Sequence, residues 1–323
     1  MDSLLVHFGI SGVTTWIFLP PLVAFVVSFF TSMGGVSGAF LLLPFQVSFL
    51  QFTSPSVSAT NFVFNIVAIP SGVYRYLKEG RMAWPLTWVV IIGTLPGVFM
   101  GYYLRVIYLP DPKAFKLFVG CVLLYIGLRL LYEMTPRSRK GKREMKALEE
   151  KFNRHVKSLR ESRKGRISSG LPQGAVIRTV SFSLSRVEYE FWGQRFSFHT
   201  IGMLSMAFVV GIIGGTYGIG GGAMIAPFCV AVFNLPVYTV AGAALMGTFL
   251  TSIAGVFFYS VIPVTGELST RPDWLLGILF GAGGFIGMYC GARLQKYVPQ
   301  KFIKLMLGLT ITFLAVRYIF QFF

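Results

Sequence analysis

Long apolar segments dominate the 323-residue chain and constrain its fold more than any other feature. A stretch of about 20 apolar residues is long enough to cross a bilayer as an α-helix. Because the bilayer offers no water to backbone groups, such a stretch must satisfy its hydrogen bonds internally, which favours helices. With 54% hydrophobic and only 13% charged residues, the chain lacks the polar surface that a soluble protein of this size needs. The sequence therefore predicts an all-α polytopic membrane protein.

Each half of the chain carries two short apolar segments followed by three longer ones. The short ones fall below the roughly 20 residues that a span requires, so they form either two short helices or the two arms of a hairpin. The longer ones are predicted to be transmembrane helices, with kinks at Pro70 and Pro96. The segments are 16–31, 36–52, 57–74, 84–104 and 114–133 in the first half, and 201–215, 219–233, 237–262, 274–294 and 302–323 in the second.

A glycine-rich stretch between the two short segments occurs in both halves. Shifting the sequence by 183 positions superposes the two copies without a gap. The superposed pairs include Gly35 and Gly218, Gly38 and Gly221, Pro44 and Pro227, and Asn65 and Thr248. Self-similarity at a fixed offset indicates a duplicated structural unit. We therefore expect one membrane repeat over residues 1–133 and a second over residues 201–323.

Loop charges predict how the two repeats are oriented. Residues 134–200 contain 16 Lys or Arg and 6 Asp or Glu, and so hold most of the net charge of +17. The positive-inside rule makes this insert cytoplasmic and removes the need for a nucleic-acid partner. An odd number of crossings per repeat then inverts the second repeat and places both termini in the periplasm, the first 15 residues as a short external tail. One basic loop, with Arg105, Lys113 and Lys116, falls outside, either by inheritance from a common ancestor or because it attracts anions to the outer mouth.

The insert has two patterns of its own. Apolar residues recur at steps of three and four over residues 145–159, which predicts an amphipathic helix on a basic background. Apolar residues partly alternate around Gly193 over residues 182–198, which predicts a small β-hairpin. The insert either fixes topology as a solvated loop or has a regulatory role.

The glycine-rich breaks are the predicted substrate site. A helix that restarts inside the membrane points free N–H groups and the positive end of its dipole at an anion, and matched breaks in two inverted repeats mark the substrate site of a transporter. The alternative is close helix packing at small residues. Apart from Glu133 at a boundary, the apolar segments contain no Asp or Glu, which argues against a cation or proton site. The candidate substrate-binding residues are Gly34, Gly35, Ser37, Gly38, Thr60, Asn61, Asn65, Thr216, Tyr217, Gly218, Gly220, Gly221, Gly222 and Thr248, with Ser32, Thr251 and Ser252 as further polar lining and with helix breaks at Pro44 and Pro227.

These motifs resemble those of a known family. The run Gly218–Gly222 leading to Pro227, its weaker twin Gly34–Gly38 leading to Pro44, the two-repeat layout and the basic central loop look like the TauE/SafE family of sulfite and sulfonate exporters. The resemblance implies secondary transport, by alternating access, of a small sulfur-containing anion such as sulfite, sulfoacetate or another organosulfonate across the bacterial inner membrane. Repeat one departs from the pattern, since Ser37 stands where repeat two has Gly220.

The same glycine-rich motifs are compatible with functions other than sulfite or sulfonate export. An anion channel could use the same half-helices, and a transporter of this type could carry thiosulfate or a carboxylate instead. An enzyme is disfavoured because the three histidines lie outside the apolar segments and no nucleophile-and-base group is visible. The three cysteines lack metal-ligand or disulfide spacing. The expected partners are therefore the anion, the lipid bilayer and, as an option, a second copy of the chain in a homodimer, with no cofactor, metal or nucleic acid.

Overall fold

The computed structural model describes most of the chain as packed helices. The described residues are 4–34, 37–78, 82–132, 135, 177–191, 194–233, 235, 237–262, 269–294 and 300–323. Within them, six helices are long and apolar enough to cross a membrane. The predicted fold class, an all-α polytopic membrane protein, is confirmed. The amphipathic helix predicted over residues 145–159 lies outside the described residues.

The first half of the chain starts with a β-hairpin and continues with helices. Its elements are β1 (Leu5–Phe8), β2 (Val13–Trp16), α1 (Leu19–Gly34), α2 (Ala39–Ser48), α3 (Ser56–Ala68), α4 (Pro70–Lys78), α5 (Trp84–Tyr103), the π-helical turn η2 (Leu104–Tyr108) and α6 (Pro112–Tyr132). Pro70 has no N–H to donate, and the span predicted over 57–74 divides there into α3 and α4. Helix α5 runs through Pro96 as one element.

The second half repeats this order of helices after a small sheet. Its elements are β3 (Arg178–Phe182), β4 (Arg186–Phe191), β5 (Gln194–His199), α9 (Thr200–Tyr217), α10 (Gly221–Val232), α11 (Val237–Val261), α12 (Trp274–Leu294) and α13 (Gln300–Phe320). The three strands pair antiparallel in the order β3-β4-β5. The sheet thus contains the strand pair around Gly193 that the sequence predicts, together with a third strand.

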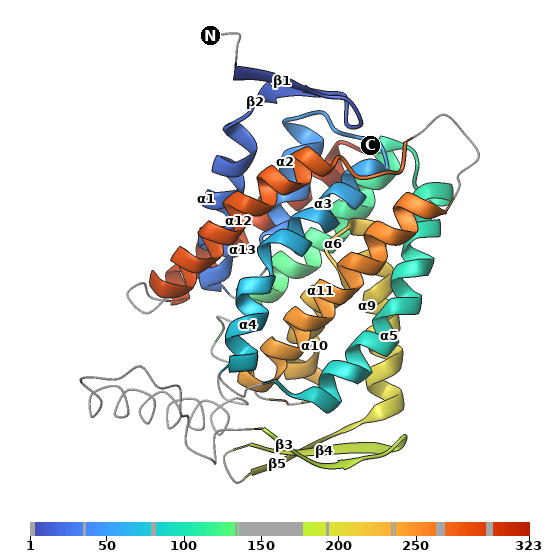
Figure 1. Ribbon diagram of the computed structural model, residues 1–323, viewed down its shortest axis with the longest axis vertical. Helices are drawn as coiled ribbons and strands as arrows, with labels where there is room; N and C mark the ends of the chain where they lie inside the picture. Colours follow the sequence, from blue (N-terminus) through green and yellow to red (C-terminus); the bar gives the residue numbers. More distant parts are fainter. Residues whose placement is uncertain are drawn as a thin grey trace.

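At the main interfaces, helices from one half of the chain pack against helices from the other half. Helix α5 packs along α9, and correspondingly α12 packs along α1, while α6 pairs with α13 and α3 with α11. Glycines allow the close approach: a Cβ on Gly211 would lie 3.1 Å from the Cα of Gly97, and a Cβ on Gly287 would meet the backbone carbonyl of Phe25. Gly287 is therefore a packing residue between α12 and α1. In Figure 1, α1 descends from β2 whereas α9 rises from β5, as inverted repeats would require, although their inversion stays a prediction.

The molecule has two distinct ends. Both termini and the β1–β2 hairpin lie at one end, and the β3–β5 sheet lies at the other (Figure 1). The hairpin is tied to the helices, because the N–H and hydroxyl of Ser11 both donate to the Asp273 carboxylate, at 3.1 and 2.9 Å. That carboxylate also accepts the Leu276 N–H in the first turn of α12 (3.2 Å). The N-terminal segment predicted as a tail is therefore an ordered part of this end of the fold.

Candidate functional site

The break between α9 and α10 depends on glycine at two positions. Gly218 ends α9 with φ of +86°, and Gly220 precedes α10 with φ of +78° and ψ of +144°. Residues with a side chain rarely adopt these angles. At Gly218 a side chain would also collide with the backbone of Ser58 on α3. The sequence Gly-Ile-Gly therefore allows the chain to end one helix and start another within a buried, close-packed region.

Side-chain donors reach several carbonyl groups at the end of α9 and in the break. Ser58 donates to the Thr216 carbonyl at 2.9 Å, Asn61 to the Gly218 carbonyl at 3.1 Å, and Asn65 to the Ile219 carbonyl at 3.1 Å. These three donors follow one face of α3 at steps of three and four. From α11, Tyr259 donates to the Gly215 carbonyl at 3.1 Å. Hydrogen-bond donors thus reach most of the carbonyl groups at the negative end of the α9 dipole, which disfavours a cation there.

At the start of α10, two N–H groups lack an acceptor among the described residues. The Gly221 N–H donates to the Thr251 hydroxyl at 3.2 Å, but the amides of Gly220 and Gly222 have no acceptor among the described residues. Gly220 cannot cap the helix because it has no side chain. The positive end of the α10 dipole is therefore open, which is the arrangement that binds anions.

Hydroxyl groups from two helices surround these amides. A Cβ on Gly221 would lie 2.6 Å from the Thr94 Cβ, one on Gly222 would lie 2.8 Å from the Thr248 hydroxyl, and one on Gly220 would lie 3.1 Å from the Ser252 hydroxyl. Thr94 and Thr248 donate to carbonyls in their own helices, at 2.6 and 2.8 Å. The Ser252 hydroxyl is buried and has no hydrogen-bond partner in the part of the chain that the structure describes. It is therefore the side chain best prepared to donate to a ligand.

At the break between α1 and α2, Ser37 lies just before the N-cap residue Gly38 and takes one of the helix N–H groups. The Ser37 hydroxyl accepts the Ala39 N–H at 3.3 Å, and the next three N–H groups bond to the carbonyls of Ser37 and Gly38 at 3.0 to 3.3 Å. The first four N–H groups of α2 therefore all have acceptors, whereas that of Gly222, the second residue of α10, has none among the described residues. Asn61 connects the two breaks, because its amide donates both to the Ala39 carbonyl (3.3 Å) and to Gly218. Gly35 lies outside the described residues, and Gly34 ends α1.

The structure corrects the predicted helix breaks at Pro44 and Pro227. Both prolines lie inside helices, Pro44 in α2 and Pro227 in α10, and the breaks precede them at the glycines. Proline lacks the N–H that would bond to the carbonyl four residues earlier. For Pro44 that carbonyl belongs to Phe40, and it accepts the Tyr217 hydroxyl at 2.8 Å instead. Pro44 thus leaves the Phe40 carbonyl in the first half of the chain free to accept the Tyr217 hydroxyl from the second half. The proline therefore helps to join the two halves and does not end the helix.

The candidate residues divide into those that surround the α10 start and those that face elsewhere. Gly218, Gly220, Gly221, Gly222, Asn61, Asn65, Tyr217 and Thr248 are brought together around the α9–α10 break, and Ser37 and Gly38 lie at the α1–α2 break. Thr60 instead accepts the Asp273 N–H at 2.9 Å, near the end of the molecule where the termini lie. Thr216 donates to the Gly101 carbonyl at 3.1 Å, on α5. Ser58 and Thr94 were missed, although each is a polar residue within an apolar span.

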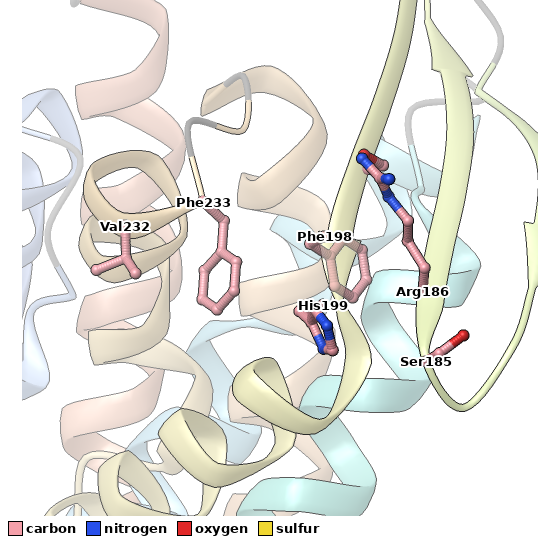
Figure 2. A pocket seen from close by; sticks show the side chains of 7 residues that line it. Ser185, Arg186, Phe198, His199, Val232 and Phe233 are labelled. Atoms are coloured by element: carbon pink, nitrogen blue, oxygen red, sulfur yellow. The ribbon is translucent and has the colours of Figure 1, made fainter.

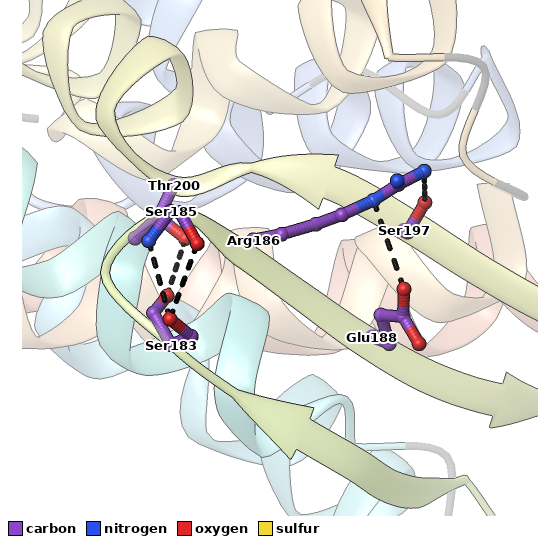
Figure 3. Close-up of polar contacts among 6 residues, drawn as sticks. All are labelled: Ser183, Ser185, Arg186, Glu188, Ser197 and Thr200. Carbon is purple, nitrogen blue, oxygen red and sulfur yellow. Dashed lines mark hydrogen bonds and ion pairs between the residues drawn. The ribbon is translucent and has the colours of Figure 1, made fainter.

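A separate cleft lies at the sheet end of the molecule. Its volume is about 540 Å³, and Figure 2 shows Phe198 and His199 on the sheet side and Val232 and Phe233 at the end of α10. Its cation, Arg186, already pairs with Glu188 (3.7 Å) and donates to Ser197 (2.7 Å), as Figure 3 shows. An anion would have to compete with that carboxylate. This cleft is therefore a weaker anion site than the α10 start.

The sheet is attached to the ends of three helices. Thr200, the first residue of α9, donates its hydroxyl to the Ser183 carbonyl at 2.8 Å (Figure 3). The Tyr189 and Thr239 hydroxyls bond at 2.8 Å, which ties β4 to α11, and burial raises the pKa of the Tyr189 phenol. The rings of Phe198 and Phe233 meet edge to face, with centroids 6.4 Å apart, at the end of α10. The sheet thus contacts both helices of the α9–α10 break from below.

Comparison with known proteins gives a consistent result. A profile described as "Sulfite exporter TauE/SafE" matches residues 21–318. The probable membrane transporter protein YunE of Bacillus subtilis (strain 168) is 21% identical over 298 residues, which cover 90% of this chain and 92% of YunE. The probable membrane transporter protein YdhB of the same organism is 26% identical over 97 residues, covering 30% of this chain and 37% of YdhB. No solved structure gives a significant match. Since the profile spans both helical halves, the glycine breaks and the polar face of α3, the chain belongs to the TauE/SafE family of sulfite exporters, which are membrane transporters.

Proposed function

We propose that this protein is a secondary transporter that exports sulfite, sulfoacetate or another organosulfonate across the bacterial inner membrane by alternating access. The observation that carries the proposal is the asymmetry of the α9–α10 break. The carbonyl groups of Thr216, Gly218 and Ile219 accept side-chain hydrogen bonds, whereas the amides of Gly220 and Gly222 have no acceptor among the described residues. A helix start with unpaired N–H donors favours an anion over a cation.

The donors suit a small oxyanion. Two backbone N–H groups and the Ser252 hydroxyl can each donate one hydrogen bond to a sulfur-bound oxygen. No Asp or Glu lies within the six candidate spans, so nothing there repels the anion. Glycine at positions 220 and 222 lets the oxygen approach the backbone closely. A sulfonate or sulfite head group has three oxygens, which matches this number of donors.

Movement between the repeats would expose the site to each side in turn. Asn61 holds carbonyls of both breaks, and Tyr217 of repeat two bonds to Phe40 of repeat one. Rearrangement of one repeat against the other would therefore alter the break directly. A channel built on the same half-helix would conduct without such a rearrangement. Saturable flux with counterflow supports the transporter, and non-saturable flux without counterflow supports the channel.

A matched pair of serines on α11 tests the site. Ser252 and Ser260 both carry buried hydroxyls without a partner, but only Ser252 lies beside the α10 start. In proteoliposomes, we expect Ser252→Ala to raise the sulfite concentration for half-maximal counterflow roughly threefold to tenfold, as loss of one hydrogen bond predicts. Ser260→Ala should leave it unchanged. Equal behaviour of the two variants would place the anion elsewhere, and a panel with sulfoacetate, taurine, thiosulfate and sulfate would identify the preferred substrate.

A further inference from the structure

Arg105 is a fully buried cation that the glycine-break site does not use. Its exposed fraction is 0%, and it lies in η2, the π-helical turn that continues α5 toward the end where the termini lie. It forms no ion pair with a carboxylate among the described residues. A buried charge without a counter-charge is strongly unfavourable unless something else compensates for it. A single-turn π-helix is also frequent at functional sites.

The neighbours of Arg105 satisfy it only in part. Its Nη2 donates to the Thr53 carbonyl at 3.2 Å, its Nη1 donates to the Leu109 carbonyl, and its Cζ lies 3.7 Å from the centre of the Phe115 ring. The ring covers one face of the guanidinium. The buried Nε has no acceptor, so at least one charge-assisted donor remains unused.

A second unused donor belongs to the residue after Thr53, whose carbonyl accepts the Arg105 hydrogen bond. That residue is Ser54, and its buried hydroxyl has no partner among the described residues. Two buried donors without acceptors, one of them on a cation, form the complement of a small oxyanion. The nearby carboxylate of Asp111 is engaged in capping α6, where it accepts the Ala114 N–H at 2.8 Å.

The position of Arg105 connects it with the proposed pathway. The Gly101 carbonyl, four residues earlier, accepts the Thr216 hydroxyl next to the α9–α10 break. Four residues correspond to about 6 Å along a helix. Arg105 therefore lies about one turn beyond the break, toward the end with the termini. Lys113 and Lys116 follow in the next helix and add positive charge at that end.

We propose that Arg105 and Ser54 form a second anion site, at which a small oxyanion, the class of substrate given above, is bound between the α9–α10 break and the end with the termini. The guanidinium supplies the counter-charge and the Ser54 hydroxyl a further hydrogen bond. This site rests on the proposed transport function. It would account for a buried cation in a chain whose spans contain no carboxylate to pair with it.

The test measures sulfite counterflow and the sulfite-induced shift in melting temperature for the full-length chain and three variants. We expect Arg105→Gln to raise the half-saturating sulfite concentration roughly 10-fold to 100-fold and Ser54→Ala roughly threefold to tenfold, with Arg105→Lys between Arg105→Gln and the wild type. Ser54→Ala should not lower the melting temperature without sulfite, because it removes an unsatisfied hydroxyl.

A purely structural arginine would give a different pattern. Arg105→Gln would then lower the melting temperature while Ser54→Ala and Arg105→Lys kept wild-type half-saturation, and the second site would be refuted. If Arg105→Gln fails to fold, Ser54→Ala still decides between the two. If the wild type shows normal sulfite counterflow and the variants keep its half-saturating concentration, only the second site is refuted. If the wild type shows neither sulfite counterflow nor a sulfite-induced shift in melting temperature, the proposed function is refuted as well.

Discussion

Among the described residues, only the Asn61 side chain hydrogen-bonds to both breaks, and replacing it tests how the two halves of the chain are joined. Its amide N donates to the Ala39 and Gly218 carbonyls, at 3.3 and 3.1 Å, and its oxygen accepts the Gln46 amide at 3.4 Å. The two carbonyls fix the orientation of the amide, since exchanging O and N would place oxygen against oxygen. Asn61→Leu keeps the approximate volume and removes all three hydrogen bonds.

The expected cost follows from the groups left without partners. The Gly218 carbonyl and the Gln46 amide lose the partners they have among the described residues, whereas the Ala39 carbonyl still lies within α2. Hydrogen bonds between membrane helices average about 0.6 kcal/mol, with a maximum near 1.7 kcal/mol, and stranding a buried polar group costs about 1–3 kcal/mol. We therefore expect Asn61→Leu to lower the free energy of unfolding by about 2–4 kcal/mol.

Asn65, one turn further along α3, is the matched control. It makes one hydrogen bond, to the Ile219 carbonyl, and its own oxygen is already buried without a donor. Asn65→Leu loses one bond but also removes an unsatisfied atom, so we expect a cost of about 0–1.5 kcal/mol. Unfolding of the purified variants in the same detergent, followed by circular dichroism, gives the order of stability. If Asn65→Leu is as destabilising as Asn61→Leu, the bridging role assigned to Asn61 is incorrect.

Three further predictions concern packing, pH and topology. Gly221→Ala and Gly287→Ala should both lower the melting temperature, because each added methyl meets a neighbouring helix, but only Gly221→Ala should also reduce the shift caused by sulfite; an unaltered shift would make Gly221 a packing residue. Burial raises the pKa of the Tyr189 phenol, so the folded state binds the phenol proton more tightly than the unfolded state does. The stability that this provides is complete below the usual tyrosine pKa of about 10 and is lost as the pH rises above it. As the pH rises above about 10, the melting temperature should fall more steeply for the wild type than for Tyr189→Phe. Single cysteines at Ser3 and Ser162 in a cysteine-free background should react with an impermeant maleimide from opposite sides of the membrane, and reaction of both from one side would contradict the inverted arrangement.

The spans were predictable because a bilayer imposes length and apolarity on every crossing helix. The segment predicted over 274–294 coincides with α12, Trp274–Leu294. The glycines of the break were predictable for a similar reason, since backbone angles near those of Gly218 and Gly220 leave few alternatives to glycine. In both cases the constraint acts on the segment itself and does not depend on its neighbours.

The partners of the polar side chains were not predictable, because they depend on which helix face meets which neighbour. Asn61 reaches the break, whereas Thr60, rotated by about 100° on the same helix, faces the start of α12. Thr94 was missed because its proximity to Gly221 arises from the packing of α5 against α10. The role of Pro44 was misjudged for the same reason, since the donor that compensates for it, Tyr217, comes from the other repeat.

The two glycine breaks occupy corresponding positions in the sequence, but their amides differ in the acceptors that they have. In repeat one, Ser37 places a hydroxyl oxygen on the first N–H of α2, and the following amides bond to nearby carbonyls. Ser37 precedes the N-cap residue Gly38, and its hydroxyl oxygen occupies a donor that an anion would otherwise need. In repeat two, the corresponding Gly220 has φ of +78° and ψ of +144°, a conformation essentially restricted to glycine. That conformation excludes Ser, Asp and Asn from the cap position of α10, and the Gly222 amide has no acceptor among the described residues, so we expect an anion at the start of α10 rather than at the start of α2.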